Sequence, residues 1–331
     1  MERRTLGSTG MDVTEIGLGT WNVGPSWGES SDEQVKESIR AALDTGMNTI
    51  DTAEVYGSGR AERLIGEVLD ERPADAERVY VPTKAAPDED ERHSEEGLRE
   101  SVAGSLDRLG TESLDLVQLH CPETAAFYEP ETFGVLEDLK AEGKIDHGGV
   151  SVEKVEEATK AIEYDVVESV QIIFNPLRLR PAERFFERAN HEDVGVIVRV
   201  PLASGLLADA FDGPEDFEEG DHRRAAIEGG VEAGVGRKGG ETFAGVPFED
   251  GLAAVRDMRR LVPEDATMAQ FTLRWILDFD AVSTVIPGST SHEHVRENAA
   301  AADLDPLSHE THGAVEDIYE EHVKDYVHHR W

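Results

Sequence analysis

The sequence is poor in cysteine and in long apolar runs. Cys121 is the only cysteine among 331 residues, so no disulfide can form within the chain, which favours a reducing compartment. No run of about 18 apolar residues occurs, so no membrane-spanning helix is predicted. The first ten residues, MERRTLGSTG, lack the apolar centre of a secretory signal. These absences predict a cytoplasmic protein without a membrane anchor.

Positive charge is also scarce. The chain has 70 acidic residues against 32 basic ones, a formal net charge of −38, and 24 of the basic residues are arginine. Nucleic acids and anionic membranes are bound through basic surfaces, so the composition excludes both partners. The acidic residues are spread along the whole chain, which favours a hydrated surface whose self-repulsion must be screened by salt. We therefore expect a protein from a salt-accumulating halophile that unfolds when salt is removed.

Short β-branched runs alternate with amphipathic segments along the chain. The predicted strands span residues 14–19, 48–51, 79–83, 114–119, 145–150, 167–172, 194–200 and 282–286. The predicted helices span residues 32–46, 60–70, 94–109, 132–142, 153–163, 181–191, 267–278 and 292–301. Strict alternation of this kind is typical of parallel βαβ units.

A doubly wound sheet and a closed barrel both fit this alternation, and the glycine pattern decides between them. A doubly wound dinucleotide-binding sheet carries Gly-x-Gly-x-x-Gly after its first strand. The nearest matches begin at Gly17 and Gly57, and both lack the third glycine. The sequence therefore predicts an α/β fold with one domain over residues 1–331, a single (β/α)8 TIM barrel whose chemistry lies at the C-terminal ends of the strands.

Three segments lie outside the repeating pattern. Residues 1–13 are predicted to form an N-terminal β-hairpin across the bottom of the barrel. Residues 205–247 form a long loop, rich in glycine and acid, after strand 7, and are either a lid over the site or a surface insertion. Residues 307–331 are predicted to form one helix and a tail.

Four polar side chains follow successive predicted strands. Asp51 and Tyr56 lie at the end of the second strand, Lys84 ends the third and His120 ends the fourth. Taken singly, each has an ordinary structural explanation: a turn cap, a half-buried ring, a solvated amine or a core imidazole. Their positions at neighbouring strand ends favour a shared site at one mouth of the barrel.

Together these residues have the chemistry that carbonyl reduction needs. When hydride reaches a carbonyl carbon, negative charge develops on the oxygen and a proton donor must neutralise it. We expect Tyr56 to donate this proton, although a tyrosine hydroxyl has an ordinary pKa of about 10. Lys84 is expected to lower that pKa, Asp51 to keep Lys84 charged, and His120 to orient the carbonyl oxygen.

The strand ends also carry a family resemblance. The runs Asp51-Thr52-Ala53-x-x-Tyr56-Gly57, Thr83-Lys84 and Gln118-Leu119-His120 resemble the catalytic tetrad motifs of the aldo-keto reductase superfamily. Further motifs of the superfamily fall at residues 17–21, 149–151, 171–175, 201–207 and 286–298, so the resemblance covers nearly the whole chain. The motifs are most similar to those of its bacterial and archaeal branch.

The resemblance implies an activity and a cofactor. A chain of this kind would be an NAD(P)H-dependent oxidoreductase that reversibly reduces aldehydes or ketones, with NADP as cofactor and NAD as the alternative. By the resemblance, Ser151 and Gln171 would hold the nicotinamide carboxamide, residues 201–204 the pyrophosphate and residues 288–298 the adenosine. The full set of implied cofactor-binding residues is Gly19, Thr20, Trp21, Ser151, Gln171, Arg199, Pro201, Leu202, Ser204, Gly288, Ser289, Thr290, His294, Glu297 and Asn298.

The chain departs from the family pattern at three positions. Val152 replaces the usual asparagine after Ser151 and removes one carboxamide contact. Arg199 replaces the aromatic residue that stacks on the nicotinamide; its planar guanidinium either stacks in the same way or pairs with a carboxylate. His294 stands where many relatives have a basic residue that contacts the 2′-phosphate, which is why NAD stays open.

Other candidates have simpler interpretations. No metal is predicted, because the histidine runs at 292–296 and 309–312 fail the His-Glu-x-x-His spacing. Cys121 is expected to be a small packing residue. Trp21 and Trp27 are either an apolar wall for substrate or core residues. The histidines at 322, 328 and 329 are expected on a solvated helix and tail.

The expected partner is a small-molecule carbonyl or alcohol substrate, selected by the loops at 21–31, 121–130 and 205–247. A monomer or weak homodimer is expected. An alternative function is a cofactor-binding regulatory subunit of an ion channel with little turnover, since some members of the superfamily have that role. A third is a barrel lyase or isomerase without nicotinamide.

Overall fold

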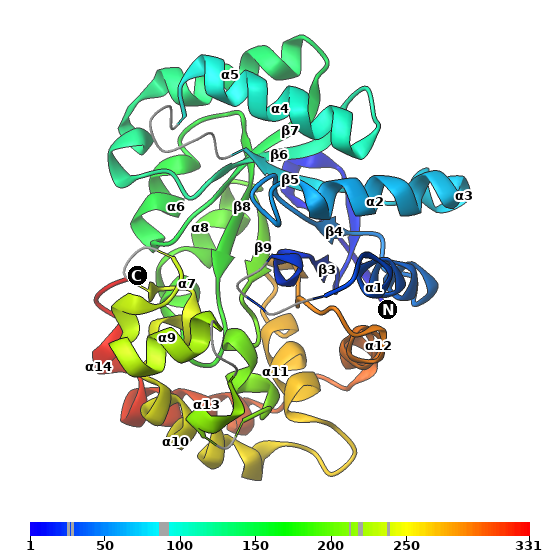
Figure 1. Ribbon diagram of the computed structural model, residues 1–331. Coiled ribbons are helices and arrows are strands. Elements are labelled where there is room, and N and C mark those ends of the chain that lie inside the picture. Colours follow the sequence, from blue (N-terminus) through cyan, green and yellow to red (C-terminus); the bar gives the residue numbers. More distant parts are fainter. Residues whose placement is uncertain (25–26, 28–29, 86–92, 212, 218–220, 237–238) are drawn as a thin grey trace.

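The computed structural model describes the chain except for residues 25–26, 28–29, 86–92, 212, 218–220 and 237–238 (Figure 1). Within the described residues, eight parallel strands surround a common axis. They are β3 (Leu18–Gly19), β4 (Ile50–Asp51), β5 (Pro82–Ala85), β6 (Leu114–His120), β7 (Ile145–Ser151), β8 (Val167–Ile173), β9 (Gly195–Arg199) and β10 (Val282–Val285).

The strands form a closed ring in chain order. Strands β5 to β10 make one parallel sheet, and β3 pairs with β4. Parallel bridges between Thr49 and Tyr80 and between Ile16 and Val285 join these two pieces on both sides. The predicted (β/α)8 barrel is therefore confirmed.

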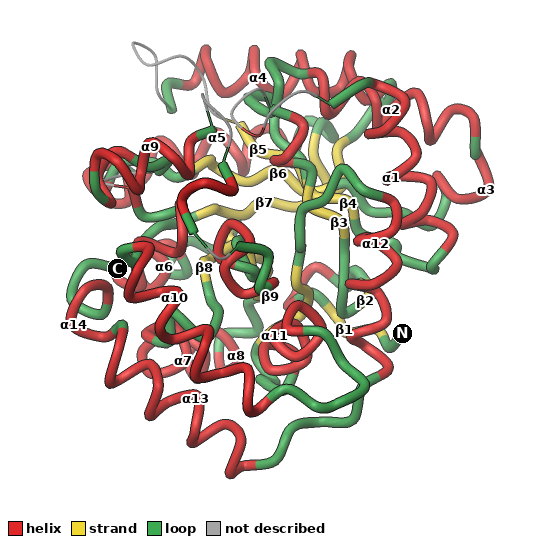
Figure 2. Tube along the Cα trace, turned by 60° about the horizontal axis from the view of Figure 1, so that its bottom comes forward, coloured by secondary structure: helices red, strands yellow, loops and turns green. Residues whose placement is uncertain are grey.

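Helices cover the outside of the barrel. Figure 2 shows the strands at the centre with helices around them. The helices that follow the barrel strands are α1 (Asp32–Asp44), α2 (Arg60–Glu71), α4 (Glu95–Leu109), α5 (Pro130–Ala141), α6 (Val155–Ala161), α7 (Arg180–Arg184), α8 (Phe186–His191), α11 (Met268–Leu277) and α12 (His292–Ala299). The remaining helices are α3 (Pro73–Ala76), α9 (His222–Gly229), α10 (Phe248–Met258), α13 (His309–His322) and α14 (Lys324–Val327). Helix α1 shows the local logic: Ser31 caps its first turn in a capping box with Gln34, and Val35 and Ile39 point inward.

The N-terminal hairpin closes the bottom of the barrel, as predicted. Strands β1 (Arg3–Thr5) and β2 (Asp12–Thr14) pair antiparallel. The buried side chains Leu6 and Met11, in the connection between these strands, belong to one apolar cluster with Ile197 of β9. Water is thereby excluded from the end of the barrel opposite the predicted site.

One predicted helix is divided in the structure, and one helix was missed. The predicted helix at 181–191 is split into α7 and α8 because Phe185 leaves helical geometry at φ −126°. Helix α10 was not predicted, although Phe248, Leu252 and Val255 give it a buried face at helical spacing. A glycine at 251 and the adjoining glycine-rich loop hid that pattern.

His322 and His328 are less solvated than expected, whereas His329 is exposed. His322 on α13 lies 2.9 Å from a carboxylate oxygen of Asp257 on α10. His328 lies 3.1 Å from the hydroxyl of Tyr319, and Trp331 is only 3% exposed. The predicted tail is thus packed against the barrel. None of the described helices combines the length and apolar character that crossing a bilayer requires.

Candidate active site

Lys84 lies fully buried in β5 at the centre of the predicted tetrad. Its Nζ donates to Asp51 Oδ2 at 2.7 Å, to the Thr52 carbonyl at 2.8 Å and to Tyr56 Oη at 3.3 Å. An ammonium group has three N–H donors, so these three acceptors match its capacity. Because β4 and β5 are neighbours in the ring, residues 33 positions apart meet at one strand end. The structure brings these three predicted side chains together.

The pKa of Tyr56 is shifted in the opposite direction from the one expected. Burial raises the pKa of Tyr56 well above its usual range, and the carboxylates of Asp51 and Glu241 raise it further, while Arg199 opposes them. Burial therefore outweighs any lowering of this pKa by Lys84, whose own effect stays a prediction. Asp51 neutralises Lys84 at short range, so the phenol adjoins a buried pair of no net charge. Tyr56 is therefore a neutral phenol that still holds its proton.

His120 completes the tetrad at the end of β6. Its ring centroid lies 5.9 Å from that of Tyr56, with the planes at 81°. Burial lowers the pKa of His120 well below its usual range, and the charges of Lys84 and Arg199 lower it further. The imidazole is thus neutral near pH 7 and can donate one N–H hydrogen bond.

A layer of amide side chains lies beneath the tetrad. Gln171 on β8 donates from Nε2 to Asp51 Oδ1 at 2.7 Å and to Gln118 Oε1 at 2.9 Å. Both bonds use Nε2, so Oε1 is the atom through which Gln171 could accept a hydrogen bond from a ligand carboxamide. Thr20 donates its hydroxyl to the Asp51 carbonyl at 2.9 Å. These contacts fix the orientation of Asp51.

Arg199, at the end of β9, is paired with a carboxylate. Its Nη1 donates to Glu241 Oε1 at 2.5 Å, and its Nη2 donates to the Val152 carbonyl at 3.1 Å. The guanidinium thus contacts the backbone of the residue that replaces the family asparagine. Its Nε is buried and has no hydrogen-bond partner in the described residues. Of the two expected interpretations the structure has the ion pair, and stacking on a nicotinamide stays a prediction.

Cys121 lies among charged groups at this end of the site. Its Sγ and the carboxylate oxygens of Glu153 and Glu241 lie within 4.8 Å of one another, a spacing that can suit a metal ion. The Arg199 guanidinium already donates to Cys121 Sγ at 3.5 Å and to Glu241. Burial raises the pKa of the Cys121 thiol to about 11, so it is not a ready thiolate at neutral pH.

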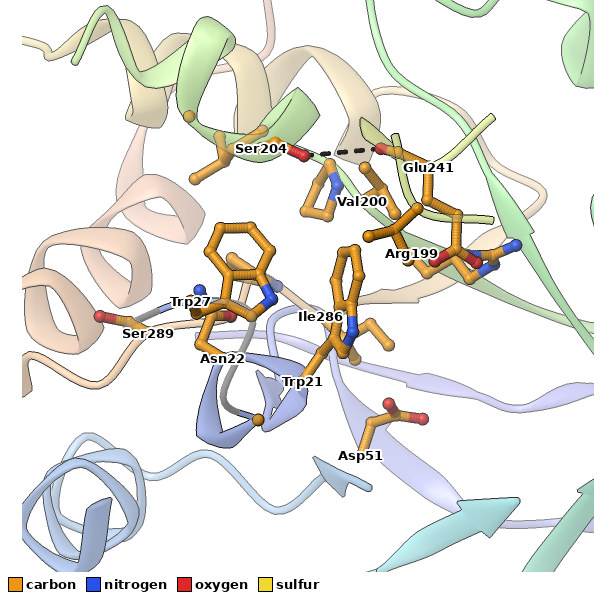
Figure 3. A pocket seen from close by; sticks show the side chains of 18 of the residues that line it. Trp21, Asn22, Trp27, Asp51, Arg199, Val200, Ser204, Glu241, Ile286 and Ser289 are labelled. Atoms are coloured by element: carbon orange, nitrogen blue, oxygen red, sulfur yellow. Dashed lines mark hydrogen bonds and ion pairs between the residues drawn. The ribbon is translucent and has the colours of Figure 1, made fainter. Parts of the chain in front are cut away.

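A single large pocket joins these groups to the predicted cofactor residues (Figure 3). Its volume is about 1070 Å³, enough for an elongated dinucleotide with a small substrate beside it. Of the predicted residues, those lining the pocket are Gly19, Trp21, Asp51, Tyr56, His120, Gln171, Arg199, Pro201, Leu202, Ser204, Gly288, Ser289, Thr290, His294, Glu297 and Asn298. Lys84, Thr20 and Ser151 lie behind this wall and are nearly or fully buried.

The loop after β9 has an unusual backbone. Val200, Ala203 and Ser204 have φ of 52°, 46° and 56°, and Gly205 has φ of 102°. Non-glycine residues in the left-handed region are strained, and such strain is concentrated at ligand sites. Successive turns of this kind also aim backbone N–H groups into one concavity that suits an anion. The Ser204 hydroxyl accepts from Phe243 N at 3.4 Å and donates to the Glu241 carbonyl at 3.5 Å, so this pocket residue also contacts the 205–247 loop.

The segment 288–298 forms the far end of the pocket. Ser291 caps α12 and accepts a hydrogen bond from His294 N at 3.4 Å. Ser289 hydroxyl donates to the Ser291 carbonyl at 3.1 Å and shapes the turn before the helix. His294 is exposed, and it is the basic side chain that this described segment contributes to the pocket lining.

Residues of the 205–247 loop cover the mouth of the pocket. The His222 ring of α9 lies 4.5 Å from that of Trp27, which itself lies 5.0 Å from Trp21. Arg223 places its guanidinium 5.0 Å from the Trp27 ring. In Figure 3 both tryptophans face the cavity, so the apolar-wall interpretation fits the structure better than core packing. Parts of the predicted substrate loops at 21–31 and 205–247 lie outside the described residues.

Sequence reasoning missed several residues of this wall. Glu241, Glu153, His93 and Arg223 line the pocket but were not predicted. Glu241 stands in a glycine- and acid-rich segment, where an acidic residue was interpreted as part of the surface coat. Glu153 follows directly after Val152 at the end of a barrel strand, and this position alone could have indicated that it lies near the site.

Comparisons with known proteins identify the family. A sequence model described as the Aldo/keto reductase family matches residues 15–320. The chain is 28% identical to the NADH-specific methylglyoxal reductase of Escherichia coli (strain K12), over 92% of this chain and 94% of that protein. It is 26% identical to a probable voltage-gated potassium channel subunit beta of Oryza sativa subsp. japonica, over 93% of each.

Solved structures show the same fold. The glycerol dehydrogenase of Gluconobacter oxydans is similar with a TM-score of 0.78 and 28% identity, covering 97% of this chain and 95% of that one. An aldo-keto reductase of Klebsiella pneumoniae in complex with NADPH is similar with a TM-score of 0.70 and 25% identity, covering 96% of each chain.

Proposed function

The chain belongs to the aldo/keto reductase family, and we propose that it reduces aldehyde or ketone carbonyls reversibly to alcohols with a nicotinamide dinucleotide. The observation that carries this proposal is the hydrogen-bonded chain from Asp51 through Lys84 to the Tyr56 hydroxyl at the mouth of the barrel. His120 faces Tyr56 across the same pocket.

The four side chains divide the proton transfer among them. Neutral His120 donates a hydrogen bond to the carbonyl oxygen and holds it near Tyr56 Oη. Tyr56 donates its proton to that oxygen as negative charge develops. Lys84 Nζ, already in contact with Oη, stabilises the phenolate left behind, and Asp51 keeps Lys84 in place. The bound reduced cofactor supplies the hydride.

The residues of the pocket fit such a cofactor. The buried Arg199 Nε has no acceptor among the described residues. The Gln171 amide uses Nε2 for its bonds to Asp51 and Gln118, so its Oε1 can accept a hydrogen bond from a ligand. A planar carboxamide offers both an acceptor and a donor, so it matches these two atoms. The left-handed turn at 200–205 offers backbone N–H groups for a pyrophosphate, and the 288–298 segment closes the far end for adenosine.

We propose NADP as the cofactor, with NAD as the alternative. The Klebsiella pneumoniae neighbour binds NADPH, which supports NADP, whereas the Escherichia coli relative is NADH-specific. In this chain the 2′-phosphate would be contacted by His294 with the hydroxyls of Ser289 and Thr290 beside it. A cytoplasmic location and a halophilic source are part of the same proposal, supported by the single cysteine and the acidic surface.

Fluorescence titration with NADPH and NADH in molar salt tests the cofactor, and reduction of methylglyoxal and of larger aldehydes then tests the reaction. Saturable binding with turnover supports the proposal. Binding of neither dinucleotide would reject the oxidoreductase reading and revive a barrel lyase or isomerase. Tight binding without turnover on any carbonyl would favour the regulatory role that the channel-subunit relative suggests.

A further inference from the structure

Glu241 reaches the pocket from a loop outside the barrel. Residues 239–245, here called the 239–245 segment, run over the mouth and place Glu241 against Arg199. The Arg199 and Glu241 side chains are 9% and 13% exposed, so the pair is largely shielded from water. A carboxylate on a loop keeps such a position only if its backbone is held.

Arg178 holds that backbone from below. It follows β8 and is 3% exposed. Its Nη1 donates to the carbonyls of Gly240 at 2.8 Å and Ala244 at 3.3 Å, on both sides of Glu241. Its Nη2 donates to the Glu153 carbonyl at 2.7 Å, on the loop after β7. One guanidinium thus ties the 239–245 segment to the ends of two barrel strands.

Trp331 fills the space beneath the same segment. The Arg178 guanidinium carbon lies 4.6 Å from its ring centroid. A Cβ on Gly240 would lie 2.7 Å from the indole ring, and a Cβ on Gly245 would lie 2.9 Å from its Nε1. Both glycines are therefore required by the close approach of the backbone to the ring.

The segment is held in a strained conformation. Phe243 and Ala244 have φ of 52° and 58°, in the left-handed region that side chains avoid. Strain of this kind persists only where surrounding contacts over-determine the backbone. Contacts to the segment include those of Arg178, of Trp331 and of the Ser204 hydroxyl, which accepts from Phe243 N. The Val235 backbone also binds it, accepting from Glu241 N and donating to Thr242 Oγ1.

We propose that Arg178 and Trp331 are positioning residues that clamp the 239–245 segment and thereby set the place of Glu241 beside Arg199 in the pocket. Neither residue is in the pocket lining, so both act through the segment. The consequence for ligand binding rests on the proposed function, whereas the clamp itself concerns the free protein.

Hydrogen–deuterium exchange on the cofactor-free protein tests the clamp directly. Trp331→Ala is expected to speed exchange of the Glu241, Phe243 and Ala244 amides by about tenfold, since local opening governs their protection. Trp331→Phe keeps an aromatic ring and is expected to retain most of the protection of these amides. His322→Gln, which breaks a hydrogen bond between α13 and α10, is the matched control and is expected to leave these amides unchanged. Unchanged exchange in Trp331→Ala, or equal acceleration in His322→Gln, overturns the proposal.

Ligand affinity tests the second step. Trp331→Ala and Glu241→Gln are each expected to weaken NADPH several-fold, while 2′-phospho-ADP-ribose, which has no nicotinamide, binds as before. The double variant is expected to match Glu241→Gln, because residues acting in one chain are not additive. An equal loss of affinity for both ligands, or additive losses in the double variant, would mean that the substitutions destabilise the fold generally, and would overturn the proposal. If the unmodified protein binds neither ligand, the proposed function fails and the exchange experiment alone decides the clamp.

Discussion

The Asp51–Lys84 pair is the most deeply buried charge in the site, with side chains 3% and 0% exposed. Removing one partner of a buried pair leaves an uncompensated charge, which costs about 3–5 kcal/mol of stability. We expect Lys84→Met to lower the free energy of unfolding by about this amount. Asp51→Asn added to Lys84→Met should recover part of the loss, because no charge is then left unpaired. Urea unfolding measures both; a double variant less stable than the single would contradict this account.

Replacement of the Tyr56 hydroxyl separates proton donation from binding. General acid catalysis contributes about 10² to 10⁴ in rate, so Tyr56→Phe should lower kcat by a factor in that range. Its ring stays in place, so the cofactor dissociation constant should change less than about twofold. Tyr164→Phe, which removes a hydrogen bond to the Phe127 carbonyl, is the control and should keep full turnover. A Tyr56→Phe enzyme with near-normal kcat would identify another donor.

His120 makes stability depend on pH. Its pKa in the folded protein is well below the ordinary value because burial and the neighbouring cations disfavour the imidazolium. In the unfolded chain it titrates near pH 6.5, so below that pH the unfolded state binds the extra proton and gains stability. We expect the free energy of unfolding to fall below pH 6.5 by up to about 1.4 kcal/mol per pH unit from this group. His120→Gln should remove that part of the slope in denaturant titrations at pH 7.5 and 5.5, and an unchanged slope would refute the assignment.

The tetrad could be found from the sequence, and Glu241 could not, for a physical reason. Asp51, Lys84 and His120 stand at strand ends, and the barrel carries every strand end to one mouth. Glu241 reaches the site only because a glycine-rich segment folds back over the mouth. The Tyr56 pKa was also missed, since its direction depends on burial and on the neutralised neighbour.

At the scale of elements, the start of α12 should decide between the two cofactors. His294 stands exposed in its first turn, beside hydroxyls that would surround a 2′-phosphate. A hydrogen bond to a charged group is worth about 1.5–3 kcal/mol, so His294→Gln should weaken NADPH by about tenfold or more. NADH has no 2′-phosphate, and its affinity should stay within about twofold. Isothermal titration with both nucleotides measures the ratio; an equal effect on both would exclude His294 as the phosphate contact.

Helix α10 shows why a helix can be missed when it is predicted from sequence alone. Its apolar positions Phe248, Leu252 and Val255 have helical spacing, but Gly251 and the preceding glycines are typical of a loop. Packing of this face against α13 overrides the weak local preference. The strand–helix repeats were predictable because each carries its own period, whereas an element inserted between repeats depends on contacts far along the chain.

At the scale of the whole molecule, closure of the ring depends on very short strands. β3 and β4 each contain two residues. Bridges at Ile16 and Gly19 join the β3 side to the β10 side, and a bridge at Thr49 joins the β4 side to the β5 side. The alternation in the sequence predicted the number of units and their order. It carries no signal for these bridges, which form because the other units bring the first and last strands together.

The acidic surface should make the whole fold dependent on salt. Arg40 pairs with two carboxylates and Arg99 with three, yet a net charge of −38 is left. Exposed ion pairs contribute only about 0–1 kcal/mol each, so the protein loses little stability when salt screens them. Repulsion among the unpaired carboxylates acts over a screening length of about 10 Å at 0.1 M and about 3 Å at 1 M. We therefore expect the Tm to fall steadily as KCl is lowered from molar to dilute buffer, with sucrose of equal osmolality failing to replace the salt. A Tm that does not change over this range would mean that repulsion is negligible and would remove the argument for a halophilic source.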